Sequence, residues 1–129
     1  MNADAQRTEL DRLTERVIGC AFEVSNTLGC GFLEKVYEKA LAVELRRQGI
    51  RVEQQKVIQV RYKGELVGDY LLDLLAEEAV IVEVKAMDAL DSAQTAQCLN
   101  YLKATGHPIC LLVNFGRPRV EVRRFVRDF

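Results

Sequence analysis

YLLDLLAEEAVIVEVK, residues 70–85, is the stretch that decides the fold. Its first half ends a strand that we expect over about residues 66–75. Ala76-Glu77-Glu78 then forms a turn, and a run rich in Val and Ile follows from 79 to 85. Runs of this length, bounded by turn residues, are typical of neighbouring β-strands. The stretch therefore predicts two adjacent strands of one sheet.

Charged side chains interrupt these apolar strands. Because successive residues alternate between the faces of a strand, Glu83 and Lys85 share one face and the valines between them point to the other. Asp73 stands inside a leucine run, where we expect Leu71 and Leu75 on its own face and Leu72 and Leu74 opposite. An isolated carboxylate in such a run costs free energy unless something compensates it. A divalent cation would do so.

The spacing of these three residues suits hydrolysis of a phosphodiester. Asp73 and Glu83, on neighbouring strands, supply the carboxylate oxygens that Mg²⁺ prefers. A bound metal polarises the phosphodiester and lowers the pKa of a water, and Lys85 would position or deprotonate that water. The alternative is a solvated sheet face on which Glu83 and Lys85 pair, and short patterns of common residues also arise by chance.

Periodicity outside this stretch predicts the remaining elements of one domain spanning residues 1–129. An apolar stripe at three- and four-residue steps over 10–28 predicts a first helix. A second helix is expected over 33–48, with Val36, Ala40, Leu41 and Val43 inward. A strand at 52–60, joined by a turn at 62–64, precedes the leucine-rich strand. A third helix, at 93–104, starts with Asp91 and Gln94 in a capping box. Strands at 109–114 and 120–126 complete the order ααβββαββ, an α/β fold with helices on a mixed sheet.

Two helical positions add candidate site residues. Glu34 lies on one face of the second helix with Tyr37, Glu38 and Leu41, and could reach the metal as a further carboxylate; alternatively it is a solvated residue in a helix's first turn. Gln97 and Tyr101 are four residues apart on the third helix and could contact a phosphate or a base. The alternative for Tyr101 is a side chain that enters the core.

Taken together, these residues resemble the GxxExxY family of the PD-(D/E)XK nuclease superfamily. Gly31, Glu34 and Tyr37 match the naming motif, Asp73 with Glu83-Val84-Lys85 looks like the metal and lysine motif, and Gln97 with Tyr101 looks like the QxxxY element of RecB-like nucleases. The resemblance covers about residues 13–126. It implies a restriction-endonuclease-like fold, a Mg²⁺ or Mn²⁺ cofactor bound by Glu34, Asp73 and Glu83, and contact with substrate through Gln97 and Tyr101. In similar proteins the stretch before Asp73 often carries a basic residue, which this chain lacks.

Composition gives little evidence of how a polyanion would be bound. The net charge is −1, so the composition does not indicate nucleic-acid binding, and any contact with DNA must depend on a local patch. Five arginines follow Phe115, either as a local patch for nucleic acid or as charges that protect a strand edge. The four cysteines lack CxxC spacing, which argues against a zinc ribbon and favours free thiols. No apolar run approaches the length of a membrane span, and we expect a soluble, cytoplasmic protein.

Three functional hypotheses follow. The first is a metal-dependent nuclease acting on nucleic acid, with DNA favoured over RNA. The second is a non-catalytic nucleic-acid-binding or protein-interaction module that retains the fold; the small size and the net charge favour it. The third is a homodimeric nuclease, because cutting both strands of a duplex needs two sites.

Overall fold

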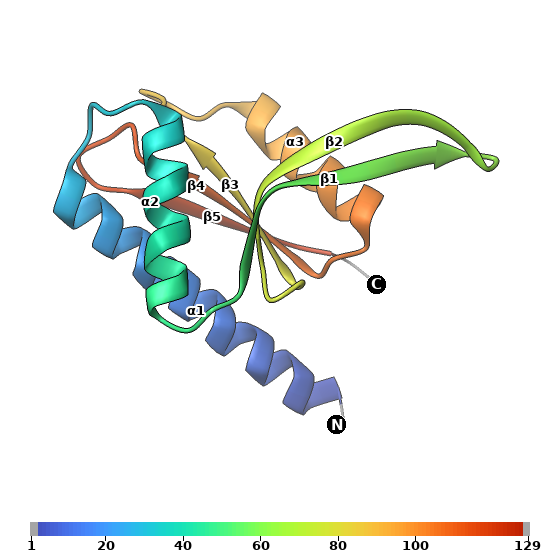
Figure 1. Cartoon of the computed structure of the whole chain (residues 1–129), viewed down its shortest axis with the longest axis horizontal. Coiled ribbons are helices and arrows are strands. Elements are labelled where there is room, and N and C mark those ends of the chain that lie inside the picture. The colour runs from blue at the N-terminus through green and yellow to red at the C-terminus, as the bar shows by residue number, and fades with distance from the viewer. Residues whose placement is uncertain (1–2, 128–129) are drawn as a thin grey trace.

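A computed structural model describes residues 3–127 and confirms the expected order of elements (Figure 1). The helices and strands are α1 (Ala3–Leu28), α2 (Glu34–Arg47), β1 (Val52–Tyr62), β2 (Glu65–Ala76), β3 (Val80–Lys85), α3 (Ser92–Thr105), β4 (Ile109–Asn114) and β5 (Glu121–Val126). The first helix begins earlier than its apolar stripe, which starts at Leu10. None of the helices within residues 3–127 has the length and apolar character needed to cross a membrane.

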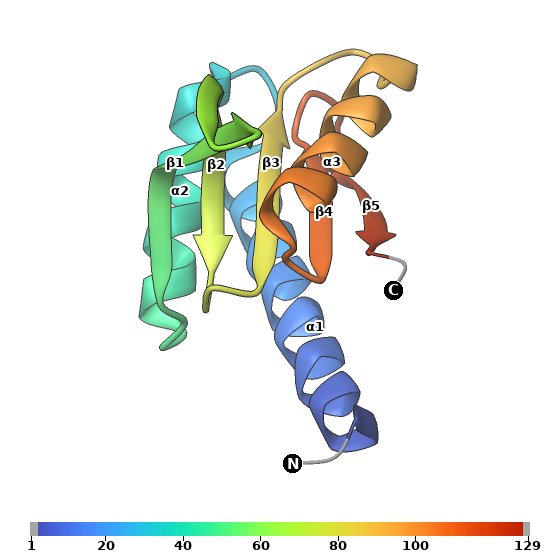
Figure 2. The same ribbon diagram turned by 90° about the vertical axis from the view of Figure 1, so that its right-hand side faces the viewer.

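The five strands form one mixed sheet in the order β1-β2-β3-β4-β5. Neighbours are antiparallel except β3 and β4, which run parallel because α3 crosses between them. Figure 2 shows α1 and α2 on one face of the sheet and α3 on the other. β4 is buried along its whole length, and β3 up to Lys85 at its end, as expected for apolar strands covered by helices on both sides.

The alternation in β3 divides the core into two clusters. Val80, Val82 and Val84 pack with residues of α1 and α2. Ile81 packs with residues of α3, among them Leu102. The period-two pattern expected for this strand is thereby confirmed, and it sends Glu83 and Lys85 toward the α3 side.

The expected inward face of α2 is wrong in part. Val36 and Val43 are 38% and 54% exposed, whereas Tyr37, Leu41 and Leu45 are fully buried. Apolar residues occur all round this helix, so hydrophobicity alone did not fix its orientation. The buried stripe is set by Tyr37, whose hydroxyl donates to the Gly29 carbonyl at 2.5 Å and whose ring stacks on Phe115 at 4.7 Å.

α3 begins and ends as the sequence indicates. The Asp91 carboxylate accepts from the Ala93 N–H at 2.8 Å, and the Gln94 side chain accepts from the Asp91 N–H at 2.7 Å, which completes the capping box. Gly106 closes the helix in the left-handed conformation, with φ of 77°. These caps fix where Gln97 and Tyr101 lie relative to the sheet.

The β1–β2 hairpin is longer than expected and projects from the sheet as a two-stranded ribbon (Figure 1). It pairs along its length, from Val52 opposite Ala76 to Tyr62 opposite Glu65. β2 in contrast pairs with β3 only from Leu74 to Ala76. The point where β2 leaves β3 is therefore next to Asp73.

Candidate active site

Asp73 and Glu83 bridge the two strands at the point where the backbone ladder stops. The Val84 N–H donates to Asp73 Oδ2 at 2.9 Å, and the Asp73 N–H donates to Glu83 Oε1 at 3.2 Å. The last backbone pair between these strands is Leu74 with Val82. Carboxylate oxygens thus take the place of the carbonyl oxygens that a continuous ladder would supply. The two expected metal ligands are brought together, each with one oxygen engaged by backbone.

The faces of β2 differ from the expected alternation. Leu72 and Leu74 were expected on one face, but Leu74 packs in the α1–α2 cluster and Leu72 in the α3 cluster with Leu75. The physical reason is a sharp local twist at Asp73. Opposite it on β1, Gln55 has φ of 52°, and regular pairs resume on both sides of that position. The twist turns β2 away from β3.

Burial and like charge dominate the electrostatics of this pair. Glu83 is 1% exposed, and its burial, together with the Asp73 charge, raises its pKa to about 9. Burial also raises the pKa of Asp73, and the Glu38 charge adds to that rise. The Lys85 ammonium opposes both shifts. The fold by itself therefore disfavours the charged forms of both carboxyls, and a nearby cation would favour them.

Glu34 and Lys85 are the other two residues that the sequence predicts for the metal and lysine site. Glu34 is the first residue of α2 and lies at the solvent-exposed rim. Partial burial raises its pKa, the Asp73 charge raises it further, and the Lys85 ammonium opposes the rise. Lys85 is half-buried at the end of β3. Glu34, Asp73, Glu83 and Lys85 are thus electrostatically linked, although they come from three elements.

Gln97 and Tyr101 bond to each other on α3. The Gln97 amide donates to the Tyr101 hydroxyl at 3.0 Å. Tyr101 is only 7% exposed and packs against Tyr70 of β2 at 5.3 Å between ring centres, so its ring enters the core. Burial and the Glu83 charge raise its pKa to about 12. The hydroxyl therefore lies within electrostatic reach of Glu83, while the half-buried Gln97 lies nearer to solvent.

Sequence reasoning assigned no role to Glu38, although it placed this residue on one helix face with Glu34 and Tyr37. Glu38 is 3% exposed and lies within reach of three donors. Gln55 donates to its Oε1 at 2.8 Å, Gln54 to its Oε2 at 3.4 Å, and Lys35 contacts both oxygens at 3.3 Å. Its position one turn after Glu34, on the stripe of Tyr37 and Leu41, was the available signal.

The donor chemistry fits Mg²⁺ or Mn²⁺. Within residues 3–127, no three His, Cys, Asp or Glu side chains converge closely enough to form a metal cage. Mg²⁺, however, is commonly held by one or two carboxylates together with water and substrate phosphates. Asp73 and Glu83 supply such a pair, each with an oxygen not used in the two backbone bonds.

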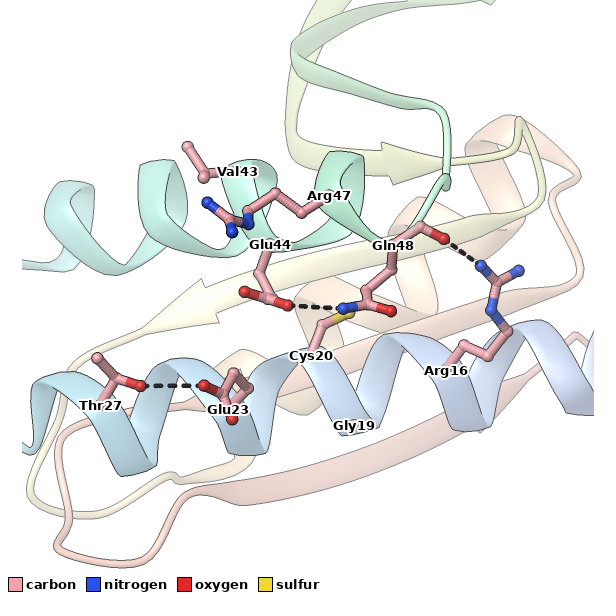
Figure 3. Close-up of a pocket in the computed structure, with 9 residues that line it drawn as sticks. All are labelled: Arg16, Gly19, Cys20, Glu23, Thr27, Val43, Glu44, Arg47 and Gln48. Carbon is pink, nitrogen blue, oxygen red and sulfur yellow. Dashed lines mark hydrogen bonds between the residues drawn. The ribbon is translucent and has the colours of Figure 1, made fainter.

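The groove between α1 and α2, about 730 Å³ in volume, involves none of the expected site residues (Figure 3). Its polar groups largely bond to one another. Arg16 donates to the Gln48 carbonyl at 2.5 Å, and the Gln48 amide donates to Glu44 at 3.1 Å (Figure 3). Such hydrogen bonds among the lining residues indicate a solvated groove between two helices.

Two of the five arginines after Phe115 bond within the fold. Arg124 forms a 2.6 Å ion pair with Asp11, and Arg117 donates to the Asp88 carbonyl at 3.1 Å. β5 is an edge strand of the sheet, where exposed arginines discourage pairing with another sheet. These contacts favour the strand-edge alternative over a patch for nucleic acid.

Comparison with known proteins identifies a superfamily for the chain. A family model described as the PD-(D/E)XK nuclease superfamily matches residues 11–125. Among solved structures, the crystal structure of an alkaline exonuclease (LHK-Exo) from Laribacter hongkongensis is similar at 13% identity. That match covers 90% of this chain and 81% of the exonuclease, with a TM-score of 0.47. No curated protein matches. The narrower resemblance to GxxExxY proteins stays a prediction.

Proposed function

The chain belongs to the PD-(D/E)XK nuclease superfamily, and from this premise we propose that it is a divalent-metal-dependent nuclease that hydrolyses phosphodiester bonds, with DNA favoured over RNA. One observation carries the proposal. Asp73 and Glu83 face each other where β2 separates from β3, and Lys85 stands two residues after Glu83 on the same strand. Metal and lysine chemistry at one phosphodiester needs these three groups together.

Asp73 and Glu83 would hold Mg²⁺ or Mn²⁺, and Glu34 would add an oxygen from the start of α2. When bound, the metal supplies Lewis-acid polarisation of the phosphodiester and a water of lowered pKa. The raised pKa values of all three carboxyls support this assignment, because a nearby cation would favour their charged forms. Binding of the cation would then displace a proton from Glu83.

Lys85 would act on the attacking water. It shares the sheet face of Glu83, and its ammonium already lowers the cost of charging Glu34, Asp73 and Glu83. A cation at this place can orient the water and offset the negative charge that grows at the phosphorus oxygens. Lys85, Asp73 and Glu83 are the proposed catalytic residues.

Gln97 and Tyr101 would divide the task of holding substrate. Gln97 lies nearer to solvent and would contact a phosphate or a base. The largely buried Tyr101 accepts the Gln97 hydrogen bond and so fixes the orientation of that amide. A homodimer would supply a second site for the second strand of a duplex, and light scattering of the purified chain tests that stoichiometry.

The direct test is cleavage of labelled DNA and RNA with Mg²⁺, with Mn²⁺ and with EDTA. We expect metal-dependent cleavage, with rates about 10³-fold lower in Asp73→Asn and Lys85→Met. Asp69→Asn is the matched control, because Asp69 is an exposed carboxylate of the same strand β2. Equal rates in the wild type and both site variants would contradict the proposal.

The second candidate is a module that binds nucleic acid or protein without cleaving. The small size and the net charge of −1 favour it. Mn²⁺ calorimetry separates the two candidates, because a nuclease site binds the ion and a module has no need of it. Binding of DNA without Mn²⁺ binding or cleavage would support the module.

A further inference from the structure

Gln55 has an unusual backbone for a residue in the middle of a strand. Its φ of 52° is left-handed, a conformation that non-glycine residues adopt at a cost. Within residues 3–127, the other non-glycine residues with positive φ lie in turns: Lys63 in the β1–β2 turn, and Glu77 and Glu78 before β3. Turn geometry explains those three and leaves Gln55 without a local cause.

The position of Gln55 relates it to the active site. Gln54 pairs with Leu74 and Lys56 with Leu72, so Gln55 is directly across from Asp73. At Asp73 the ribbon twists, so that Leu74 packs on the α1–α2 side of the sheet and Leu72 on the α3 side. The pairing of β2 with β3 ends at the same place. The Asp73 carboxylate reaches the Val84 N–H across the resulting gap, at 2.9 Å.

A buried carboxylate holds Gln55 in place. The Gln55 amide donates to Glu38 Oε1 at 2.8 Å, across the interface between β1 and α2. Glu38 is itself fixed by Lys35 from its own helix and by Gln54 from β1. A bond to a charged, buried acceptor is stronger than one between neutral groups, which is what maintaining an unfavourable backbone conformation requires.

We propose that Glu38 and Gln55 are positioning residues whose hydrogen bond holds the Gln55 backbone in the left-handed conformation, turns the ribbon at Asp73 and aims the Asp73 carboxylate at β3. The effect on cleavage rests on the proposed nuclease function, but the effect on geometry does not. Glu38 and Gln55 act through Asp73 and need not touch substrate.

The Val84 N–H provides a readout independent of catalysis. Amide hydrogen exchange by NMR reports whether Asp73 still accepts from Val84, with the β3–β4 ladder amides as internal references. In Gln55→Ala we expect exchange at Val84 about tenfold faster than in the wild type. Alanine lacks the hydrogen bond to Glu38, and the left-handed backbone is unfavourable for it. Gln55→Gly should stay near the wild type, since glycine adopts that backbone freely.

A second-site rescue sharpens the test. Glu38→Ala should accelerate Val84 exchange as Gln55→Ala does, and adding Gln55→Gly to it should restore protection. Lys63→Ala is the matched control, because Lys63 has φ of 49° in the hairpin turn and should leave Val84 unchanged. Should Glu38→Ala fail to fold, the alanine and glycine variants of the half-buried Gln55 still decide the matter.

Two results would overturn the inference: unchanged Val84 exchange in Gln55→Ala, or a glycine variant as poorly protected as the alanine variant. On cleavage, Gln55→Ala should lower kcat with KM unchanged, and Gln55→Gly should restore kcat. If the wild type cleaves nothing, the nuclease proposal fails, while the amide measurements still decide the positioning role.

Discussion

Two buried glutamates lie on either side of Asp73 and have opposite surroundings. Glu38 on α2 is met by an ammonium and two amides, from Lys35, Gln54 and Gln55. Glu83 on β3 is bonded by the Asp73 backbone N–H and lies beside the Asp73 carboxylate. Both are nearly inaccessible to solvent, at 3% and 1% exposed. The chain therefore surrounds one buried carboxyl group with donors and places the other beside a second carboxyl group.

Under the proposed function, this difference separates a structural carboxylate, Glu38, from a metal-binding one, Glu83. Burying a charge is costly unless partners compensate it, and Glu38 has those partners within the fold. Glu83 has one backbone N–H donor and the Lys85 ammonium, but burial and the Asp73 charge outweigh them, and its pKa rises to about 9. Under the proposed function, a bound divalent cation would favour the charged form of Glu83.

The largest effect should come from the same substitution at the two positions. Glu38→Gln should lower the free energy of unfolding by about 3 kcal/mol at pH 7, because it removes the charge that Lys35 contacts and sets an amide donor against other donors. Glu83→Gln should leave stability unchanged or raise it, since the metal-free Glu83 is already protonated at pH 7. Urea unfolding measures both.

Glu65→Gln, at an exposed position of β2, gives the baseline for a surface substitution. Equal losses at Glu38 and Glu83 would show that both carboxylates are structural, and the contrast between the two regions would be lost.

In the presence of a divalent metal, Glu83 should contribute to the stability of the folded protein. At 100-fold its dissociation constant, Mn²⁺ should stabilise the wild type by about 2.7 kcal/mol, because it binds the folded site and not the unfolded chain. Asp73→Asn and Glu83→Gln should abolish this gain. Thermal unfolding with and without Mn²⁺ measures it, and Asp69→Asn is the control. A gain retained in Glu83→Gln would place the ion elsewhere.

Much of this arrangement could be predicted from the sequence because strand periodicity is local. The alternation of Val80, Val82 and Val84 with Glu83 and Lys85 determined which side chains share a face, and the structure follows it. Capping at Asp91 likewise depends on neighbours a few residues away. Local patterns of this kind placed Glu83 and Lys85 on one strand face and Gln97 near Tyr101.

The remainder depended on tertiary contacts. Nothing local marks Gln55 as left-handed, because Gln does not favour that conformation and its partner Glu38 is 17 residues away. The twist that results made the expected alternation around Asp73 wrong. In α2, valines on several faces hid the buried stripe, which is determined by where Tyr37 packs.

A smaller effect is expected from pH. Without metal, Glu83 holds its proton in the folded state until the pH approaches its pKa of about 9, whereas the ordinary pKa of a glutamate is 4.5. The contribution of Glu83 to the free energy of unfolding is fully present below the pKa that Glu83 has in the unfolded chain. It is lost as the pH rises through the pKa that Glu83 has in the folded protein. Stability should thus fall between pH 7 and 8.5, by up to about 1.4 kcal/mol per pH unit. Asp73 and Glu34, with raised pKa values, act in the same direction.

Urea unfolding in EDTA across pH 7 to 8.5 tests this slope, and Glu83→Gln should flatten it. His107 does not interfere, because burial lowers its pKa from 6.5 and its contribution is lost only as pH falls. A wild-type slope that equals that of Glu83→Gln would mean that Glu83 is compensated in the free protein.

The smallest effect should come from Tyr101→Phe. This variant tests whether the Tyr101 hydroxyl interacts with Glu83. The hydroxyl accepts from Gln97, and its loss should cost about 1 kcal/mol in urea unfolding. Since burial is the first cause of the raised Glu83 pKa and Asp73 the second, the pH slope should survive this change. Gln97→Ala is the matched control, because it removes the same bond from the other side. If the pH dependence of the unfolding free energy changed in Tyr101→Phe but not in Gln97→Ala, the hydroxyl would be a partner of Glu83. Glu83 would then, like Glu38, have a side-chain partner within the fold.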